Sequence, residues 1–323
     1  MPAFNSTSTQ VEQVTAFRHV AIIGLGLQGG SIGLAVQEFV PGSSTTGYDL
    51  SPENRARAAE LGLVHQVCET AADAVRDADL VIFCVPPGAI GEAAAAIRDA
   101  IPADALVSDV GSSKQAIAKA LRKALPDHLV IPAHPVAGTE NSGPNAGFAH
   151  LFRNRWCIVT PPEQTDLVKL SALVEFWETL GANVEIMTPE HHDLVLAVTS
   201  HLPHLIAYTI VGTASDLEDV TQGEVIKYSA GGFRDFTRIA ASDPTMWRDV
   251  FLSNKEAVLT MLQRFTEDLT ALQRAIRVGD GNALFDHFTR TRAIRRSIIE
   301  EGQDDSRPDF GRGDHNGGVG RDS

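Results

Sequence analysis

His134 directly follows an apolar stretch at residues 130–133 and opens a loop rich in glycine, asparagine and proline. A histidine at the end of a strand can accept the proton of a hydroxyl group whose carbon gives up a hydride. The simpler alternative is a histidine that caps the loop through backbone hydrogen bonds. The segment 134–147 (HPVAGTENSGPNAG) is therefore a candidate for proton transfer coupled to a redox step.

A second polar segment, DVGSSK at residues 109–114, also follows a short apolar run. In doubly wound α/β folds, ligands bind at the carboxyl ends of the strands, which lie along one edge of the sheet. Both segments occupy such positions in the sequence. We therefore expect residues 109–114 and 134–147 to contribute to one site.

A glycine motif near the start of the chain offers a place for a dinucleotide. Gly24, Gly26 and Gly29 have GxGxxG spacing, after an apolar strand and before small residues that suit a helix start. Such glycines allow a tight turn, let the backbone approach a pyrophosphate and let the helix pack closely on the strand. Free N–H groups at the helix N-terminus can hold the phosphates. The expected cofactor contacts are Gly24, Gly26, Leu27, Gln28, Gly29, Asp49 and Val85.

Asp49 indicates which dinucleotide fits. It ends the next predicted strand, where an acidic side chain reaches the ribose hydroxyl groups of the adenosine half. Its charge would repel a ribose phosphate, and the nearest arginines, Arg55 and Arg57, come a turn or more later. We therefore expect NAD and consider NADP less favourable. Val85 ends another strand, before a Pro-Pro-Gly turn that suits a loop passing over the cofactor.

Two segments in the second half of the chain carry further polar candidates. The sequence SHLPH places Ser200, His201 and His204 within about one helical turn, and Pro203 should bend that helix. This histidine spacing, or the adjacent pair His191-His192, would also suit a metal, but no carboxylate or thiol pattern accompanies either, so we expect no metal site.

Arg234 and Arg238 are four residues apart and could present both guanidinium groups to a dianionic ligand. On a charged helix face they could equally form salt bridges to Asp235 or Glu224. Both interpretations stay open from the residues alone.

The composition limits the classes of partner. A net charge of −14 argues against a general nucleic-acid or anionic-membrane binder, which needs a basic surface. Cys68, Cys84 and Cys157 have no CxxC spacing, so neither a zinc site nor a disulfide framework is expected. The first 15 residues do not resemble a signal peptide, and no apolar run approaches the length that spans a bilayer. We therefore expect a soluble, cytoplasmic protein.

Short apolar runs alternate with helical patterns up to residue 187. This alternation predicts an α/β fold with a Rossmann-like, doubly wound, mainly parallel sheet. The expected strands are 20–23, 45–48, 80–85, 106–109, 130–133, 157–160 and 184–187.

The pattern changes after residue 187. Thr188-Pro189 and Asp243-Pro244 are typical helix starts, and residues 254–277 and 282–300 have the periodicity of long amphipathic helices. The predicted organisation is a disordered leader (1–16), an NAD-binding Rossmann domain (17–188), an all-helical domain (189–301) and a disordered tail (302–323).

Taken together, the motifs resemble those of the prephenate/arogenate dehydrogenase family, NAD-dependent enzymes of tyrosine biosynthesis that oxidatively decarboxylate a cyclohexadienyl substrate. The resemblance spans residues 20–300 and rests on GLGLQGGS, DVGSSK, HPVAGTENSG, SHLPH and GFRDFTRIAASDPTMWRD, in that order. It implies conversion of prephenate to 4-hydroxyphenylpyruvate, or of arogenate to tyrosine. It also implies a homodimer built from the helical domains, with the active site between the two domains.

The resemblance further implies roles for individual residues. His134 is the catalytic histidine bonded to the C4 hydroxyl group, and Ser112 supports this histidine and the nicotinamide. Ser113 replaces Ser112 if the loop register differs by one. Arg238 binds a substrate carboxylate, with Arg234 nearby. The residues implied to line or gate the pocket are Thr139, Glu140, Ser200, His201, His204 and Trp247.

Two other hypotheses stay open at this stage. A β-hydroxyacid or imine reductase has a similar architecture, but such enzymes commonly use a lysine in the helical domain where this chain has SHLPH. A non-catalytic NAD-sensing regulator would bind the dinucleotide and make no use of His134. Prephenate and arogenate differ only in a keto or amino group, and we assign no residue to read that group.

Overall fold

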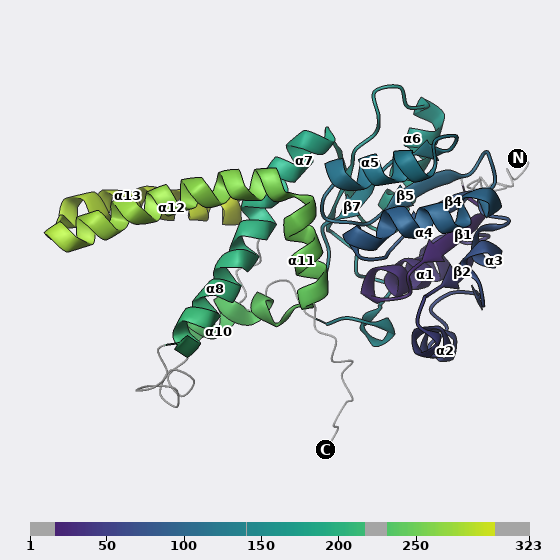
Figure 1. The fold of residues 1–323 in the computed structure, drawn as a ribbon, viewed down its shortest axis with the longest axis horizontal. Coiled ribbons are helices and arrows are strands. Elements are labelled where there is room, and N and C mark those ends of the chain that lie inside the picture. Colours follow the sequence, from purple (N-terminus) through teal and green to yellow (C-terminus); the bar gives the residue numbers. More distant parts are fainter. Residues whose placement is uncertain (1–16, 140, 217–230, 301–323) are drawn as a thin grey trace, which may run out of the picture. The chain divides into compact units, whose positions relative to one another are not determined.

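The structure is a computed structural model that describes residues 17–139, 141–216 and 231–300. It contains two compact units, residues 1–261 and residues 262–323. The predicted leader and tail lie outside the described residues, as do Glu140 and Glu224. Up to residue 187 the elements (Figure 1) are β1 (His19–Ile23), α1 (Leu27–Phe39), β2 (Ser44–Tyr48), α2 (Pro52–Glu60), β3 (Gln66–Val67), α3 (Ala71–Val75), β4 (Leu80–Phe83), η1 (Pro87–Ala89), α4 (Ile90–Ile97), η2 (Arg98–Ala100), β5 (Leu106–Asp109), α5 (Gln115–Ala124), β6 (Leu129–Val130), β7 (Ala133–Pro135), η3 (Pro144–Ala146), β8 (Trp156–Val159), α6 (Leu167–Thr179) and β9 (Asn183–Ile186).

Six strands form one parallel sheet in the order β3-β2-β1-β4-β5-β6. This is the strand order of dinucleotide-binding Rossmann domains, so the predicted fold class is confirmed. The order reverses between β1 and β4, and the carboxyl ends of these two strands are Ile23 and Phe83. Ligands of such sheets bind at this reversal, which therefore fixes where the site must be.

Both faces of the sheet are buried, as a parallel sheet requires. On β1, Val20 and Ile22 pack in a core with residues of α1 and α6, whereas Ala21 and Ile23 pack with residues of α3, α4 and α5. Helices α4 and α5 lie side by side over the second face (Figure 1). The near-continuous hydrophobic strands of the sequence are explained by this burial on both faces.

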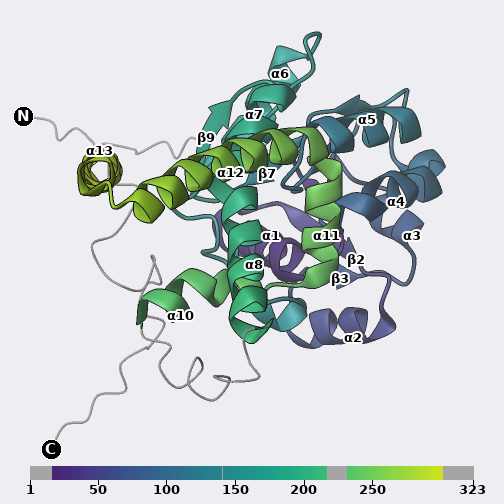
Figure 2. The same cartoon turned by 60° about the vertical axis from the view of Figure 1, so that its left-hand side comes forward.

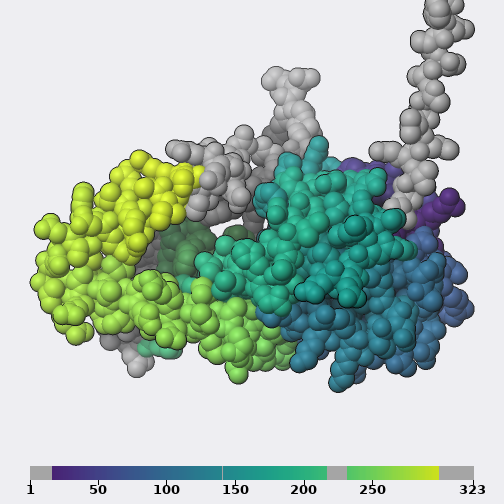
Figure 3. Space-filling view, turned by 90° about the horizontal axis from the view of Figure 1, so that it is seen from above, coloured from purple at the N-terminus to yellow at the C-terminus, as the bar shows by residue number. Residues whose placement is uncertain are grey.

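A second, smaller sheet in the order β7-β8-β9 corrects the predicted strand at residues 130–133. β6 ends at Val130 in the first sheet, and β7 begins at Ala133 in the second, where it runs antiparallel to β8. Pro132 lies between them and has no N–H group to donate to a sheet. His134 is consequently the middle residue of β7, opposite Ile158, rather than the first residue after a strand. Figure 3 shows the blue and teal parts of this domain as one continuous surface.

After residue 188 the described elements are helical, as predicted. Thr188 accepts a hydrogen bond from the His191 N–H at 3.2 Å and caps the first helix, and Asp243 caps α11 in the same way at 2.8 Å from the Met246 N–H. A wide π-helical turn directly precedes the helix that contains Pro203, where a bend was predicted. The elements are α7 (Pro189–Leu196), η4 (Ala197–His201), α8 (Leu202–Asp216), α10 (Gly231–Thr237), η5 (Arg238–Ala241), α11 (Pro244–Ser253) and α12 (Lys255–Val278).

The continuous helix from Pro189 to Asp216 differs from one expectation. With a mean hydropathy of 1.6, it has the length and composition of a membrane span, and only 22% of its most apolar stretch is buried in the single chain. Its N-terminal part is nevertheless fixed to the Rossmann domain, because the carboxylate of Asp193 accepts hydrogen bonds from the backbone of Lys114 and Gln115. The exposed apolar residues of this helix include Leu194, Val198, Ile210 and Val211.

The second unit contains the end of α12 and the helix α13 (Gly281–Glu300). The turn between them begins at Gly279, which has a left-handed φ of 73°. Asp280 then caps α13 by accepting the Ala283 N–H at 3.0 Å. Several large apolar side chains of this unit are exposed, among them Leu269, Ile276, Val278, Phe285, Phe288 and Ile294.

Candidate active site

The glycine motif forms a tight turn between β1 and α1. Gly24 has a φ of 102°, and a Cβ atom there would lie 2.5 Å from the carbonyl oxygen of Cys84. A Cβ atom on Gly29 would lie 1.9 Å from the carbonyl oxygen of Gly24, so this glycine lets the helix pack against the turn. A Cβ atom on Gly26 would meet nothing within 4 Å. The motif thus has the crowded and open positions that a pyrophosphate turn requires.

The N-terminus of α1 fits a phosphate group. Gly26 is the N-cap residue, and no side chain caps the helix there. The first N–H groups of α1, at Leu27, Gln28 and Gly29, have no acceptor within the helix, since such groups need partners outside it. Together with the helix dipole they form an anion site, so the residues present fit the phosphates of a dinucleotide.

Asp49 is held in place at the carboxyl end of β2. Its Oδ2 accepts the Leu25 N–H at 2.9 Å, and its Oδ1 accepts the Ser51 N–H at 3.0 Å and the Asn54 side chain at 3.1 Å. Arg55 donates to the Asp49 carbonyl oxygen at 2.9 Å and lies near Glu69, while Arg57 binds Glu60 and Asn145. Arg57 is therefore engaged elsewhere, and Arg55 binds the backbone and not the carboxylate of Asp49, whose negative charge would repel a ribose phosphate.

The loop after His134 lies against the dinucleotide turn. The side chain of Gln28 donates a hydrogen bond to the Ala137 carbonyl oxygen, and Ser31 of α1 accepts the Phe148 N–H at 3.0 Å. Thr139 is exposed in this loop and accepts the Asn141 N–H at 3.2 Å, whereas Glu140 lies outside the described residues. The predicted cofactor and proton-transfer segments therefore meet at one edge of the protein. Val85, partly buried, follows β4 at the same edge.

His134 is the first member of a buried chain of hydrogen bonds. Its Nδ1 lies 2.8 Å from Nε2 of His192, and Nδ1 of His192 lies 2.9 Å from Oδ1 of Asp193. The three side chains are 7%, 0% and 1% exposed. Nε2 of His134 takes no part in these hydrogen bonds and is the ring nitrogen available to a substrate.

Burial keeps both histidines of this chain neutral. Burial lowers the pKa of His134 well below its ordinary value, and the neighbouring His192, Lys114 and His201 lower it further. Burial also lowers the pKa of His192, against the opposing effect of Asp193. For Asp193, burial alone would raise the pKa, but hydrogen bonds from His192 and from the backbone of Lys114 and Gln115 outweigh it, so the pKa is lowered. At neutral pH this series of hydrogen bonds therefore consists of the neutral rings of His134 and His192 and the carboxylate of Asp193.

The DVGSSK turn contains a fully buried ion pair. Lys114 Nζ lies 2.5 Å from Asp109 Oδ2 and donates to the Ala133 carbonyl oxygen, also at 2.5 Å. Burial raises the pKa of Asp109 and lowers that of Lys114, and the attraction between the two charges opposes both shifts. Because Ala133 precedes His134 on β7, this pair fixes the backbone that carries the histidine.

The two serines of the turn occupy different environments. Ser113 is fully buried, and its Oγ lies 2.7 Å from Oγ of Ser253 at the end of α11. Ser112 is partly exposed. Ser113 thus joins the turn to the helical segment, and Ser112 is the serine of the pair that is open to a ligand.

The SHLPH segment and α11 form the helical side of the site. The ring of His204 stacks on Trp247, with α8 and α11 side by side (Figures 1 and 2), and its Nδ1 lies 2.9 Å from the Ser200 carbonyl oxygen. His201 is fully buried, with Nδ1 3.1 Å from the amide nitrogen of Asn254. Nε1 of Trp247 is buried without a hydrogen-bond partner in the described part of the chain, and Nε2 of His201 is buried with no well-formed hydrogen bond there, although the Ser112 backbone is close enough to raise the pKa of that ring. Burial lowers the pKa of both His201 and His204 to about 4.

Arg238 and Arg234 are not equivalent, although both were predicted to bind substrate. Helix α10 ends at Thr237, and Arg238 begins the 3-10 turn η5, where it is half-buried and close enough to His204 to lower the pKa of that ring. The side chain of Arg234 is 77% exposed and lies 3.9 Å from Asp235. The structure therefore places Arg238, and not Arg234, next to the other predicted pocket residues.

The sequence did not assign a role to His192, Asp193 or Lys114. His192 was considered only as half of a histidine pair with metal-binding potential, and the structure places it between His134 and Asp193. The two histidines are 58 residues apart, so no local pattern could pair them. The sequence feature that could have pointed to His192 and Asp193 is the polar run EHHD at residues 190–193, directly before an apolar stretch of the same helix.

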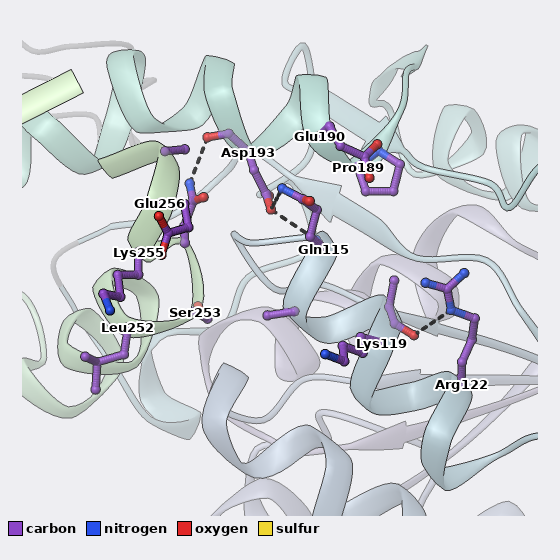
Figure 4. Close-up of a pocket in the computed structure, with 14 residues that line it drawn as sticks. Gln115, Lys119, Arg122, Pro189, Glu190, Asp193, Leu252, Ser253, Lys255 and Glu256 are labelled. Carbon is purple, nitrogen blue, oxygen red and sulfur yellow. Dashed lines mark hydrogen bonds between the residues drawn. The ribbon is translucent and has the colours of Figure 1, made fainter. Parts of the chain in front are cut away.

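A cavity of about 560 Å³ lies between α5, the start of α7 and the junction of α11 with α12 (Figure 4). Asp193 and Asn254 form part of its wall, and the figure shows Asp193 reaching Gln115. His134 and the glycine motif do not line it. The far end of the hydrogen-bonded chain therefore borders a cavity that is distinct from the dinucleotide turn.

These features place the chain in the class of Rossmann-fold dehydrogenases, because the loop that follows a buried neutral histidine is bonded to the helix of the dinucleotide turn. Residues 32–186 match the nucleotide-binding domain of prephenate dehydrogenase, and residues 188–290 match its dimerization domain. The chain belongs to the prephenate dehydrogenase family, as the resemblance implied. The first match begins after the glycine motif, so the cofactor turn is established by the structure itself.

Individual relatives agree with this assignment. The chain is 44% identical over 285 residues to the cyclohexadienyl dehydrogenase of Zymomonas mobilis, which covers 88% of this chain and 97% of that protein. The crystal structure of A. aeolicus prephenate dehydrogenase with hydroxyphenyl propionate and NAD+ has a TM-score of 0.80 and 34% identity, covering 87% of this chain and 98% of that one. Synechocystis arogenate dehydrogenase has a TM-score of 0.73 and 26% identity, covering 87% and 99%.

Proposed function

We propose that this protein is an NAD-dependent cyclohexadienyl dehydrogenase that oxidatively decarboxylates prephenate, arogenate or both. The observation that carries the proposal is His134, a neutral buried base whose loop is bonded to the dinucleotide turn through Gln28 and Ala137. The structure with NAD+ and a hydroxyphenyl compound from A. aeolicus, and the arogenate dehydrogenase from Synechocystis, support the cofactor and the substrate class.

In the proposed reaction, Nε2 of His134 accepts the proton of the C4 hydroxyl group. NAD, when bound, supplies the acceptor for the hydride from C4. The ring carboxylate leaves as carbon dioxide, its bonding electrons complete the aromatic ring, and the C4 oxygen takes back the proton from His134 to give the phenol. The protein has mainly to orient the ring and hold its charges, which is within the range of positioning and general-base catalysis.

The other predicted site residues, apart from the exposed Arg234, are assigned supporting roles in this reaction. Arg238 is suited to a substrate carboxylate because its planar guanidinium group binds carboxylates through two parallel hydrogen bonds. His201 and Trp247 offer the two buried polar atoms described above, which a bound substrate can satisfy. Ser112, which is partly exposed, is proposed to contact the nicotinamide, and Thr139 of the loop after His134 is proposed to line the pocket; Glu140 lies outside the described residues.

NAD is the proposed cofactor. The fixed carboxylate of Asp49 suits two ribose hydroxyl groups and repels a ribose phosphate. Titration of the protein with NAD and NADP tests this choice, with NAD expected to bind at least about tenfold more tightly. Equal affinities would contradict the role given to Asp49.

We also propose that the protein is a homodimer formed by its helical segments. A match to a dimerization domain at residues 188–290 and the exposed apolar side chains of α8, α12 and α13 support an interface there. Light scattering should give twice the chain mass of 34.6 kDa. Phe285→Ser combined with Phe288→Ser should yield a smaller species, and a monomeric wild-type protein would contradict the proposal.

A cytoplasmic location is proposed on the ground that Cys68, Cys84 and Cys157 are all free, which suits a reducing compartment. Fractionation of cells that express the full chain tests it. Recovery of the protein with membranes would contradict the proposal and would point instead to the apolar helix at 189–216.

One assay tests the activity. Formation of NADH is measured with prephenate, with arogenate and with a panel of 3-hydroxy acids. Turnover of the first, the second or both is expected, and their relative rates define the preferred substrate. Turnover of the 3-hydroxy acids alone would show a different dehydrogenase, and NAD binding without any turnover would show a non-catalytic protein.

A further inference from the structure

The chain from His134 to Asp193 has a direction that follows from its last member. A carboxylate can only accept hydrogen bonds, and Asp193 is ionised because its pKa is lowered. Nδ1 of His192, 2.9 Å away, must therefore carry the proton and donate it. Since His192 is a neutral ring, its Nε2 then has a lone pair and accepts.

The same reasoning fixes the tautomer of His134. Its Nδ1 lies 2.8 Å from the accepting Nε2 of His192, so Nδ1 must be the protonated nitrogen of His134. A neutral imidazole carries one ring proton, so Nε2 is left with a free lone pair. Nε2 takes no part in the hydrogen bonds to His192 and Asp193, so it is the ring nitrogen available to a substrate.

We propose that His192, held by Asp193, is a positioning residue that sets His134 in the tautomer whose Nε2 can accept a proton. Neither residue touches the reacting atoms in this scheme. The inference rests on the proposed function for its kinetic consequence, but the tautomer itself is a property of the protein without ligands.

Asp193 is well fixed for this purpose. Its Oδ1 accepts the Lys114 N–H at 2.6 Å and its Oδ2 accepts the Gln115 N–H at 3.1 Å, so it caps the start of α5 (Figure 4). Asn254 donates to its carbonyl oxygen at 2.7 Å. The start of α5 therefore holds the carboxylate that orients the two rings, and Asn254 at the end of α11 holds the backbone of the residue that carries it.

The chain also accommodates the charge that forms during turnover. When Nε2 of His134 accepts a proton, the ring becomes an imidazolium that still donates Nδ1–H to His192. The nearby cation Lys114 and the rings of His201 and His192 disfavour this charge, while the anion Asp193 favours it through His192. Because His192 is also the acceptor for the Nδ1–H of this imidazolium, loss of the acceptor at position 192 should weaken His134 as a base.

The first test needs no activity. The protein is labelled with ¹⁵N in its histidine rings, and the protonated nitrogen of His134 is identified by NMR at neutral pH, with His134→Asn used for assignment. The expected result is a proton on Nδ1 in the wild-type protein and a mixture of tautomers in His192→Phe. A proton on Nε2 in the wild-type protein would overturn the proposal, whether or not the protein turns over any substrate.

The second test compares three variants by kinetics. His192→Phe keeps a flat ring but removes the acceptor, and should lower kcat by on the order of 100-fold with KM changed by less than about threefold. His192→Gln should regain most of this loss, because its amide oxygen can accept from His134 while its amide nitrogen donates to Asp193. His191→Phe is the matched control, because His191 is adjacent to His192 but is exposed and takes no part in the chain of hydrogen bonds.

A double-mutant cycle separates positioning from general stability. In the His134→Asn background, His192→Phe should change kcat by less than about twofold, because the residue through which it acts is gone. Equal losses in both backgrounds, or equal losses from Phe and Gln, would overturn the proposal. If His192→Phe does not fold, the tautomer of the wild-type protein and the Gln variant decide the question. An inactive wild-type enzyme with the expected tautomer would refute only the proposed function.

Discussion

His204 lies flat against Trp247, with ring centroids 3.5 Å apart and planes inclined by 22°. This contact joins α8 to α11 and partly buries an ionisable ring, and the charge of Arg238 adds to the effect of burial in lowering the pKa of His204. His201 lies one helical turn before His204, and the pKa of its ring is influenced by His192, Asp193 and His204. The stability of this region must therefore depend on pH.

We predict that the protein loses stability as the pH falls from about 6.5 to 4. The pKa values of His201 and His204 are about 4 in the folded state, while unfolded histidines titrate near 6.5, so the unfolded state binds more protons within this window. Above pH 6.5 both states are neutral at these sites and the contribution vanishes. Calorimetry from pH 7 to 4 should show a falling Tm.

The matched variants for this prediction are His204→Phe and His191→Phe. The first keeps a ring against Trp247 but removes the titrating group, so Tm should depend less on pH. The second changes an exposed histidine and should leave the dependence as in the wild-type protein. Identical slopes for all three proteins would show that the buried histidines are not responsible.

The glycine turn should respond differently to two similar changes. In Gly29→Ala the new methyl group would meet the Gly24 carbonyl oxygen at 1.9 Å, so we expect a loss of stability on the order of 3 kcal/mol. In Gly26→Ala it meets nothing within 4 Å, so the protein should fold normally. NAD affinity should still fall at least about tenfold in Gly26→Ala, because the methyl group occupies space needed by the pyrophosphate. Thermal unfolding and NAD titration measure both effects, and unchanged NAD binding in Gly26→Ala would argue against the turn as the cofactor site.

His134→Asn should lower kcat by on the order of 10²–10⁴ while KM stays nearly constant, since a positioned general base contributes about that much. Steady-state kinetics with the preferred substrate measures both constants, and NAD titration checks that the cofactor site is intact. A variant with nearly normal turnover would exclude His134 as the base.

Arg238→Gln should raise KM by about 10–100-fold with a smaller effect on kcat, because it removes a charge-assisted contact to a carboxylate. Arg234→Gln is the control on the neighbouring helix, and the exposure of that side chain leads us to expect constants within about threefold of the wild type. If the two variants behave alike, the half-buried position of Arg238 has no special role in binding.

Much of the fold was predictable because it depends on local patterns. The apolar runs, the glycine spacing and the helix starts at Thr188 and Asp243 are all properties of short segments. The strand expected at 130–133 was wrong because Pro132 allows the chain to leave one sheet and enter another, a choice made by tertiary packing. The two-residue strand β3 was missed because Gln66 and Val67 are too few to form a pattern.

The site was predictable only in part. His134 could be found from its position after an apolar run, and the distinction between Arg238 and Arg234 could not, since it depends on where α10 ends. The pairing of His134 with His192 joins segments 58 residues apart and exists only in the folded chain. The apolar character of the helix at 189–216 was underestimated, because polar residues such as Ser200, His201 and His204 interrupt its apolar residues along the sequence.

The buried pair of Lys114 and Asp109 restricts how this chain can evolve. Both side chains are inaccessible to solvent, so a substitution of either one alone leaves an isolated charge in the interior, which typically costs about 3–5 kcal/mol. Natural variants should therefore change the two positions together or not at all. Lys114 also holds the backbone of Ala133, the residue before His134. We therefore expect substitutions at positions 109 and 114 to be rare wherever His134 is retained.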